Sequence, residues 1–365
     1  MSFDVTSLIR SEVAGMEPYV PILPFEVLSA QLGRPADQII KLDANENPYG
    51  PSPRVRQALA TMPYPHIYPD PESRLLRAAL SDYVQLPAEY LLVGHGADEL
   101  IDLVMRLFLQ PGDAIINCPP TFGIYPFDAA VNGARVCNVP RRQDFALDVE
   151  AIAQAVNAEP RCKLVFVTSP NNPDGGLISD DELHLLLTLP VVIVLDEAYV
   201  EFAGLEHSHI HLVPRYDNLI VLRSFSKWAA LAGLRLGYGA FPLALIEHLW
   251  KIKQPYNVSV AAQVAGIASL EDREYLLGNV RRLIAERERM AALLKTIPYL
   301  HPYPSHANFI LCKVTGRDAF DLKRSLAERG ILIRYYYTPG LTDHVRFTVG
   351  RPEDTDRVIQ ALRAL

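Results

Sequence analysis

Apolar and polar positions alternate along this chain in two rhythms. Short apolar runs of strand length recur between stretches whose apolar residues return every three or four positions, as on one face of a helix. The clearest predicted strands are YLLVG (90–94), DAIINC (113–118), KLVFVT (163–168), VVIVLD (191–196), NLIVLRSF (218–225) and LRLGYGAF (234–241). Between the first two, DELIDLVMRLFL predicts a helix with one buried face. Strands that alternate with helices predict an α/β fold with a mostly parallel sheet.

The alternation breaks at WKIKQPYNVSV (250–260), which is rich in Lys, Pro, Asn and Ser, and we place a domain junction there. A chain of 365 residues fits two domains. We expect an N-terminal arm and part of a small domain over 1–40, a large domain over 41–253 and a small α+β domain over 254–365. The elements predicted beyond the junction are a long helix over 273–297, stopped by Pro298, the strand HANFILCKV (306–314), the helix DAFDLKRSLAER capped by Gly330, the strands ILIRYYY (331–337) and VRFTVG (345–350), and a last helix ending at Leu365.

Charge and composition narrow the function classes. The net charge of -7 offers no general attraction for nucleic acid or an anionic membrane surface. The N-terminus lacks the apolar core of a secretory signal, and the longest apolar run, LPVVIVL, is far shorter than the roughly 20 residues that cross a bilayer. The four cysteines are isolated in the sequence. We therefore expect a cytoplasmic protein that binds neither nucleic acid nor membrane.

Two motifs stand where predicted strands end. GHGADE (94–99) lies between a predicted strand and a predicted helix, where backbone N–H groups can bind a phosphate. An ordinary tight turn without a ligand would have the same sequence pattern. Asp196 ends a fully apolar strand, at the sheet edge where open α/β folds bind ligands. A buried carboxylate there needs a positive partner, such as a protonated pyridine nitrogen. Tyr199 would reach the same ligand. The alternative interpretation is that Asp196 only caps the next element.

Lys227 follows another predicted strand, with Ser224 and Ser226 beside it and Arg235 further along. A lysine amine forms a Schiff base with an aldehyde cofactor, while hydroxyls and a guanidinium suit a phosphate. A surface lysine at a strand end is the alternative. The flanking residues favour the first interpretation.

The segment SFSKWAALAGLRLGY (224–238) resembles the Schiff-base lysine motif SxSKxxxxxGxRxGY of fold type I aminotransferases, and DEAY and SPNNPDG resemble that superfamily's other two markers. More narrowly, the chain resembles the histidinol-phosphate aminotransferases. The matching stretches run in order along the chain: PY (18–19), LDANENPYG (42–50), IYPDPES (67–73), GADE (96–99), PPTFGIY (119–125), SPNNP (169–173), VLDEAYVEF (194–202), RSFSKWAALAGLRLGYG (223–239), QPYNV (254–258), ANFIL (307–311), GILIR (330–334), TPGL (338–341) and VRFTVG (345–350).

The resemblance implies pyridoxal 5'-phosphate as the cofactor and a role for each matching residue. Lys227 would form the Schiff base, with an amine pKa lowered by cationic surroundings, and Asp196 would pair with the pyridine nitrogen. Tyr199 and Asn172 would bond the phenolic oxygen. Phe122, where many family members have Tyr, would stack on the ring. The residues expected at the phosphate are Ala97 and Asp98 through their amides, Ser224, Ser226, Arg235 and, from the partner subunit of a homodimer, Tyr68.

The substrate side is also implied by the resemblance. Arg346 looks like the arginine that binds the substrate anion, with Arg334 as a second contact suited to a phosphate. Tyr19, Asn45 and Asn308 match positions that line the substrate. The superfamily usually has Thr where this chain has Asp174, and we expect a changed turn there rather than lost activity.

The implied reaction transfers the amino group of histidinol phosphate to 2-oxoglutarate, in histidine biosynthesis. An aromatic amino acid donor is the nearest alternative, because the same arginine can bind an α-carboxylate. A decarboxylase of threonine phosphate is a further alternative. A transcription regulator with this fold would need an added basic DNA-binding domain.

The tract EHSHIH (206–211) places three histidines at alternating positions. Such a tract suggests a metal, but no carboxylate or cysteine set completes a site. We expect a solvated loop and no metal.

Overall fold

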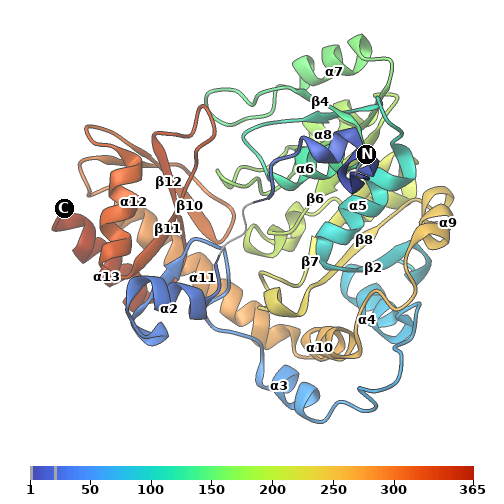
Figure 1. Ribbon diagram of the computed structural model, residues 1–365. Coiled ribbons are helices and arrows are strands. Elements are labelled where there is room, and N and C mark those ends of the chain that lie inside the picture. Colours follow the sequence, from blue (N-terminus) through green and yellow to red (C-terminus); the bar gives the residue numbers. More distant parts are fainter. Residues whose placement is uncertain (1–2, 20–22) are drawn as a thin grey trace.

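Two β-sheets, each covered by helices, organise the protein (Figure 1). The computed structural model describes residues 3–19 and 23–365. The larger sheet has seven strands and the smaller one five. Residues 25–42 join the C-terminal part of the chain in the smaller lobe, while the middle of the chain builds the larger one (Figure 1).

The larger sheet has the strand order β2-β8-β7-β6-β5-β3-β4. Its strands are β2 (Leu91–His95), β3 (Ala114–Asn117), β4 (Arg135–Asn138), β5 (Cys162–Thr168), β6 (Val192–Asp196), β7 (Leu219–Ser224) and β8 (Leu236–Ala240). Neighbours are parallel except at β8, which is antiparallel to β2 and β7. The predicted α/β fold with a mostly parallel sheet is confirmed. The prediction missed only β4 of this sheet, a short edge strand with exposed ends.

Helices pack on both faces of this sheet, and this explains why its central strands are apolar throughout. One face carries α5 (Gly96–Phe108), α6 (Ile124–Val131) and α9 (Leu243–Ile252). The other carries α4 (Arg74–Val84), α7 (Val149–Ala158), α8 (Asp180–Leu187) and α10 (Val260–Glu271), with α3 (Pro53–Ala60) against α10. Neighbouring strand residues such as Ile193 and Val194 belong to opposite cores, as the pleat requires.

The carboxyl ends of several strands meet at one sheet edge. Thr168 at the end of β5 is in register with Asp196 at the end of β6, and β7 runs parallel beside them to Ser224. At the end of β2, the chain enters α5 at Gly96. This edge therefore collects the predicted chemical groups from four parts of the sequence.

The smaller sheet has the order β1-β11-β12-β10-β9. Its strands are β1 (Ile40–Leu42), β9 (Leu300–Pro302), β10 (Phe309–Val314), β11 (Ile331–Tyr335) and β12 (His344–Thr348). Only the β1–β11 pair is parallel. The helices of this lobe are α2 (Phe25–Leu32), α11 (Arg273–Leu294), α12 (Ala319–Glu328) and α13 (Pro352–Arg363). β1 brings an N-terminal segment into the C-terminal lobe.

The packing does not change at residue 254, where the composition predicts the junction. α10 packs against α3 and α4, and the apolar side chains of α11 belong to the large core as far as Leu283. From Met290 onward they belong to the small core. We therefore propose that the two domains join along α11. In this division, residues 253–259 are the loop between α9 and α10, two helices of the large domain.

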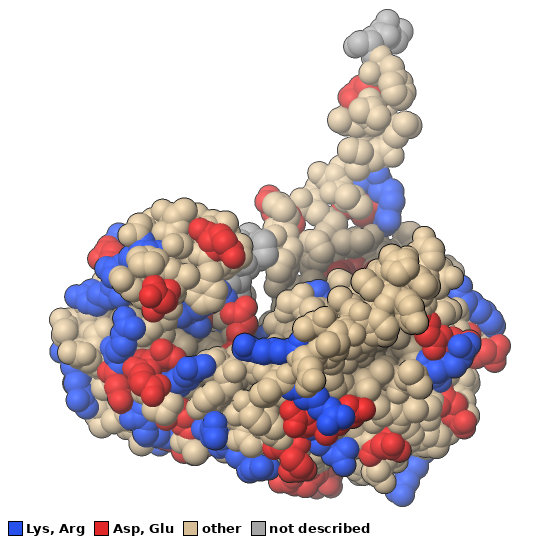
Figure 2. Space-filling model, turned by 90° about the horizontal axis from the view of Figure 1, so that it is seen from below, with Lys and Arg blue, Asp and Glu red and all other residues tan. Residues whose placement is uncertain are grey.

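The N-terminal segment lies against α6, where Nη2 of Arg10 donates to the carbonyl oxygen of Val131 at 2.8 Å, and the residues before Arg10 project from the body of the molecule (Figure 2). It contains the short helix α1 (Ser11–Ala14) and exposed apolar residues, among them Phe3, Leu8 and Ile9. The arm expected over 1–40 also includes 1–2 and 20–22, which lie outside the described residues. Within 3–19 and 23–365, none of the helices is both long enough and apolar enough to span a bilayer.

Candidate active site

A hollow lies at the carboxyl edge of the large sheet. It is lined by Ala97, Asp98, Phe122, Thr168, Asn172, Asp196, Ala198, Tyr199, Ser224, Ser226, Lys227, Ala232 and Arg235. The structure thus brings together all of the predicted catalytic and cofactor residues except Tyr68.

Lys227 lies in this hollow, directly after β7, and its Nζ donates a hydrogen bond to the carbonyl oxygen of Ala44 at 3.1 Å. Burial, and after it the nearby positive charge of Arg346, lower the pKa of the amine to about 8. The expected lowering is present, but burial is its main cause and the cationic surroundings come second. A substantial fraction of the amine is therefore neutral and nucleophilic near neutral pH.

Asp196 is buried at the end of β6, where its carboxylate accepts two hydrogen bonds. The hydroxyl of Tyr125 on α6 donates to Oδ2 at 2.8 Å, and the N–H of Ala198 donates to Oδ1 at 3.0 Å. Burial raises the pKa of Asp196 to about 6, although the Tyr125 bond opposes the rise. A cation inside the hollow would stabilise the ionised form.

The N-terminus of α5 faces Arg235 at the other end of the hollow. Nη2 of Arg235 lies 2.6 Å from Oδ2 of Asp98. Gly96 has a φ of +77°, and a Cβ there would lie 2.7 Å from Nη2 of Arg235. A Cβ on Gly237 would lie 2.4 Å from the N atom of Ala97. The glycines therefore allow β8, Arg235 and the helix N-terminus to approach closely, which leaves N–H groups and a guanidinium around one small space.

These groups fit pyridoxal phosphate. Phosphate is suited by the amides that begin α5, by the two serine hydroxyls of the hollow and by Arg235. The buried carboxylate of Asp196 suits a protonated ring nitrogen, and the amine of Lys227 suits an aldehyde. Phe122 lines the hollow as a flat apolar wall, with its ring edge-on to Tyr125 at 5.8 Å between centroids. Each polar part of the cofactor meets a group of complementary charge.

Arg346 approaches the hollow from β12 of the small sheet. Its Nη1 donates to Oδ1 of Asn172, and Nη2 donates to the carbonyl oxygen of Asp43 at 2.8 Å. Arg334 is its cross-strand neighbour in β11, and both guanidinium groups lie near the ring of Tyr336, at 6.0 and 5.8 Å from its centroid. Asn172 is thus engaged with Arg346. The two arginines expected at the substrate anion stand side by side.

Asn45 and Asn308 lie behind Tyr199 rather than along the hollow. Nδ2 of Asn45 donates to the hydroxyl of Tyr199 at 2.9 Å, and Nδ2 of Asn308 donates to the carbonyl oxygen of Asn45 at 2.9 Å. Both asparagines are buried. The Tyr199 oxygen accepts from Asn45, so its own hydrogen points to another acceptor. The structure gives Asn45 and Asn308 the position of supports for Tyr199.

Two further predicted residues, Tyr68 and Tyr19, lie away from the hollow of this chain. Tyr68 is 78% exposed and stacks on Tyr256, with ring centroids 4.5 Å apart, in a separate surface depression. Tyr19 packs edge-on against Phe127 and is 44% exposed. The placement of Tyr68 agrees with a role at the site of another subunit, which a single chain does not test.

Asp174 closes the turn after β5 from inside. Its Oδ1 accepts from Nδ2 of Asn171, and its Oδ2 accepts from the N–H of Gly176 at 2.7 Å. Burial raises the pKa of Asp174, and the buried Arg141 opposes the rise. The carboxylate of Asp174 therefore lies inside this turn and fixes the side-chain amide of Asn171.

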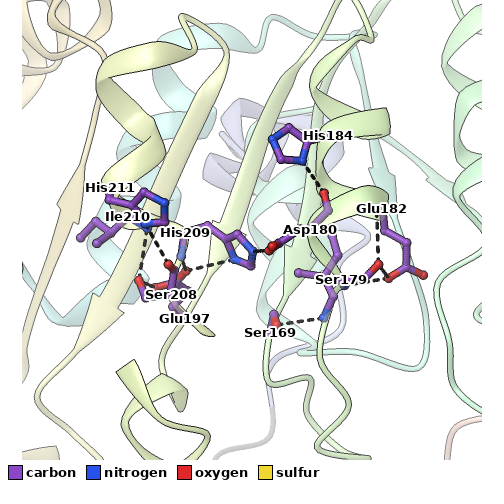
Figure 3. A network of polar contacts seen from close by, with 11 residues as sticks. Ser169, Ser179, Asp180, Glu182, His184, Glu197, Ser208, His209, Ile210 and His211 are labelled. Carbon is purple, nitrogen blue, oxygen red and sulfur yellow. Dashed lines mark hydrogen bonds and ion pairs between the residues drawn. The ribbon is translucent and has the colours of Figure 1, made fainter. Parts of the chain in front are cut away.

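Within the histidine tract Ser208 and His209 are buried (Figure 3), whereas His207 and His211 are exposed, as a solvated loop requires. His209 is 5% exposed; its Nε2 lies 2.9 Å from Oδ1 of Asp180, and its N–H donates to Oε1 of Glu197 at 2.7 Å. Ser208 donates to the other oxygen of Glu197, which also accepts from Arg223. The tract is polar because it binds a buried carboxylate. Among the described residues, no cluster of three or more His, Cys, Asp or Glu groups could hold a metal.

The sequence did not reveal the importance of Tyr125 and Thr168. Tyr125 is fully buried in α6, and its hydroxyl lies 2.8 Å from both Asp196 and Thr168. Thr168 ends β5 and lines the hollow. The position of Thr168 in register with Asp196 was the only available signal, because a tyrosine in an apolar helix usually belongs to the core.

Comparisons with known proteins agree with this geometry. The sequence profile of the family described as aminotransferase class I and II matches residues 37–362. The chloroplastic histidinol-phosphate aminotransferase of Nicotiana plumbaginifolia is 58% identical over 98% of this chain and 86% of its own length. The histidinol-phosphate aminotransferase of Roseiflexus castenholzii is 52% identical over 100% of this chain and 99% of its own. The crystal structure of the Sinorhizobium meliloti histidinol-phosphate aminotransferase with pyridoxal 5'-phosphate superposes with a TM-score of 0.88 at 27% identity, over 98% of both chains.

Proposed function

The chain belongs to the class I and II aminotransferases, and we propose that it transfers the amino group of L-histidinol phosphate to 2-oxoglutarate. The products are imidazole acetol phosphate and L-glutamate, and the reaction is a step of histidine biosynthesis. The observation that carries the proposal is the hollow in which Lys227, Asp196 and Arg235 converge within reach of two arginines from the small sheet. Relatives at 52–58% identity over nearly the whole chain bear this substrate in their names.

The cofactor is pyridoxal 5'-phosphate, which supplies an aldehyde for the amine and an electron sink when its ring nitrogen is protonated. Asp196 holds that nitrogen in its protonated form through opposite charge. Tyr199 donates its hydroxyl hydrogen to the phenolic oxygen, with Asn45 fixing the hydroxyl from behind. Arg235, Ser224 and Ser226 hold the phosphate.

Lys227 carries out the proton transfer. With the cofactor bound, the Nζ of Lys227 would be placed to accept the proton from the substrate carbon as a general base. The lowered pKa of Lys227 suits this role, because the amine must be neutral to accept a proton near neutral pH. The same Nζ would then pass that proton to the cofactor carbon as a general acid, so that the amine ends the half-reaction neutral again.

Arg346 and Arg334 bind the substrate anion. Their guanidinium groups, side by side on β12 and β11, match the several oxygens of a phosphate. In the second half-reaction Arg346 meets a carboxylate of 2-oxoglutarate instead. Tyr19 contributes from the N-terminal segment when the site is closed.

The proposed assembly is a homodimer in the cytoplasm. Tyr68, exposed beside Tyr256, contacts the phosphate bound by the partner subunit. The exposed apolar side chains of the N-terminal segment and of the Tyr68 depression support a second copy as the occupant. The other partners are small molecules. The plant relatives are called chloroplastic, so the compartment is a matter for direct localisation.

The test compares L-histidinol phosphate and L-phenylalanine as amino donors with 2-oxoglutarate as acceptor. We expect a much higher kcat/KM for histidinol phosphate. A preference for phenylalanine would replace the substrate with an aromatic amino acid. Release of carbon dioxide from threonine phosphate without an oxo acid would indicate a decarboxylase.

A second test addresses Lys227 itself. Lys227→Ala should lower turnover by at least about 10²- to 10⁴-fold. Borohydride reduction of the wild type should attach the cofactor to the peptide that contains Lys227. Lys251→Ala is the control, because Lys251 pairs with Glu247 on the exposed side of α9. Undiminished turnover of Lys227→Ala would refute the proposed mechanism.

A further inference from the structure

A chain of buried hydrogen bonds runs from Asp196 to the turn after β5. The Tyr125 hydroxyl lies 2.8 Å from Oδ2 of Asp196 and 2.8 Å from the hydroxyl of Thr168. The Thr168 hydroxyl lies 3.2 Å from that of Thr121, which donates to Oδ1 of Asn171 at 2.9 Å. Four links thus connect a carboxyl group to a side-chain amide through three hydroxyl groups.

The far end of this chain has a fixed polarity. Nδ2 of Asn171 donates to Oδ1 of Asp174 and to the carbonyl oxygen of Pro120 at 3.1 Å. Both partners are acceptors, so they hold the amide with its oxygen toward Thr121. Asn171 therefore accepts a hydrogen bond from Thr121 and cannot donate one. The buried Asp174, which stands where the family has Thr, helps to set this orientation.

Counting protons shows that the four links are not all possible when Asp196 is ionised. Each hydroxyl carries one hydrogen, so three hydrogens serve four links between two acceptor ends. One link is then left without a hydrogen. When Asp196 is protonated, its own hydrogen points to Tyr125, and Tyr125, Thr168 and Thr121 each donate to the next oxygen. All four links are then complete.

We propose that Tyr125, Thr168 and Thr121 form a relay that couples the proton on Asp196 to the Asn171–Asp174 turn, with Tyr125 as a positioning residue for the carboxylate that faces the cofactor's ring nitrogen. The proposal rests on the proposed function, which places that nitrogen beside Asp196. Ionisation of Asp196 costs the relay one hydrogen bond, and a cation beside the carboxylate offsets this cost. Asn172, the neighbour of Asn171, accepts from Arg346, so the relay ends beside the substrate arginine.

The relay makes a specific prediction for Thr121→Val. The substitution removes the links of Thr168 and Asn171 to the Thr121 hydroxyl, and two links remain. When Asp196 is ionised, the hydroxyl hydrogens of Tyr125 and Thr168 complete both of them. When Asp196 is protonated, the Thr168 hydroxyl has no acceptor. The titration midpoint of the Asp196 carboxyl should fall by about one pH unit. The other ionisable groups that face Asp196 are Asp98, Glu197 and Tyr199, which the substitution leaves in place.

The experiment is an infrared pH titration of the carboxyl stretch in the full-length chain after the cofactor has been removed, assigned by its loss in Asp196→Asn. Thr121→Ser keeps the hydroxyl and should keep the wild-type midpoint. In a Tyr125→Phe background, Thr121→Val should no longer change the midpoint, because the connection to Asp196 is cut. If Tyr125→Phe does not fold, Thr168→Val replaces it as the test. This substitution breaks the same relay and should lower the midpoint as Thr121→Val does.

Two results would overturn the relay: an unchanged midpoint in Thr121→Val, or a shift that persists in the Tyr125→Phe background. The titration does not depend on which amine is the substrate, so it fails or succeeds separately from the donor comparison. A second readout is the dissociation constant of pyridoxal phosphate about one pH unit below the wild-type midpoint, where most of the wild-type Asp196 carboxyl is protonated. It should fall several-fold in Thr121→Val, because the ionised carboxylate no longer costs a link.

Discussion

At the residue scale, burial sets the chemistry of the two principal groups in opposite directions. It lowers the pKa of Lys227 to about 8 and raises that of Asp196 to about 6. Burial disfavours the charged form of both groups, so a larger fraction of the amine is neutral and a larger fraction of the carboxyl is protonated than in water. The cofactor's aldehyde reacts with the neutral amine of Lys227. The positive charge of its protonated ring nitrogen favours the ionised form of the Asp196 carboxyl. The site is therefore prepared for a ligand with a cation at one end.

Attachment of the cofactor should follow the ionisation of Lys227. Only the neutral amine attacks an aldehyde, so the attachment rate should rise about tenfold per pH unit below pH 8 and level off above it. Stopped-flow absorbance of the cofactor mixed with the cofactor-free chain measures this rate. Arg346→Met should raise the midpoint, because the arginine lowers the pKa, while Arg363→Met on the exposed end of α13 should not. A midpoint near 10.5 would contradict the effect of burial.

At the element scale, the predictable parts are those whose neighbours on both sides are apolar. The strands around β5, β6 and β7 are buried on both faces, so their sequences are continuous apolar runs that predict a strand without further information. β4 and β9 are short and partly exposed, and their sequences carry no such run. α10 could not be assigned to its domain, because the composition of a loop does not tell which core the next helix joins.

Close contact between β8 and α5 should make Gly237 sensitive to a single methyl group. A Cβ there meets the backbone of Ala97 and Gly96, which cannot rotate away. We expect Gly237→Ala to destabilise the protein by about 1–3 kcal/mol and to weaken cofactor binding. Denaturant unfolding and fluorescence titration measure the two effects. Gly233→Ala is the matched control, since its Cβ would meet no atom within 4 Å, and equal behaviour of the two variants would argue against the tight approach.

The link between α8 and the sheet should depend on pH through His209. Burial lowers the pKa of His209, but its bonds to Glu197 and Asp180 outweigh burial and raise the pKa above its usual value. A raised pKa in the folded state gives stability that is complete below about pH 6.5 and is lost as the pH rises through the folded value. His209→Gln should therefore lower Tm more at pH 6 than at pH 9. His211→Gln on the same segment is the control, and a larger difference at pH 9 would contradict the sign.

At the scale of the whole molecule, the site of one chain is incomplete under the proposed function. Lys227, Asp196 and Arg235 lie in the hollow, whereas Tyr68 lies exposed in a different depression. The sequence motifs predict that the first three residues lie together, because the motifs stand at the ends of strands of one sheet. They do not predict where Tyr68 binds, because its contact depends on a surface shared by two copies of the chain.

Mixing two inactive variants tests this shared site. In a dimer of Lys227→Ala with Tyr68→Ala, one site combines the wild-type Lys227 of one subunit with the wild-type Tyr68 of its partner. Each variant alone should have low activity, whereas random exchange should restore about a quarter of the wild-type rate, because half of the dimers are mixed and each has one complete site. Subunit exchange under mild denaturant, followed by an activity assay and sedimentation analysis, measures the recovery. The control mixes Lys227→Ala with a double variant that carries both Lys227→Ala and Tyr68→Ala, and this mixture should stay inactive. If the test mixture forms stable dimers but also stays inactive, Tyr68 and Lys227 belong to separate sites.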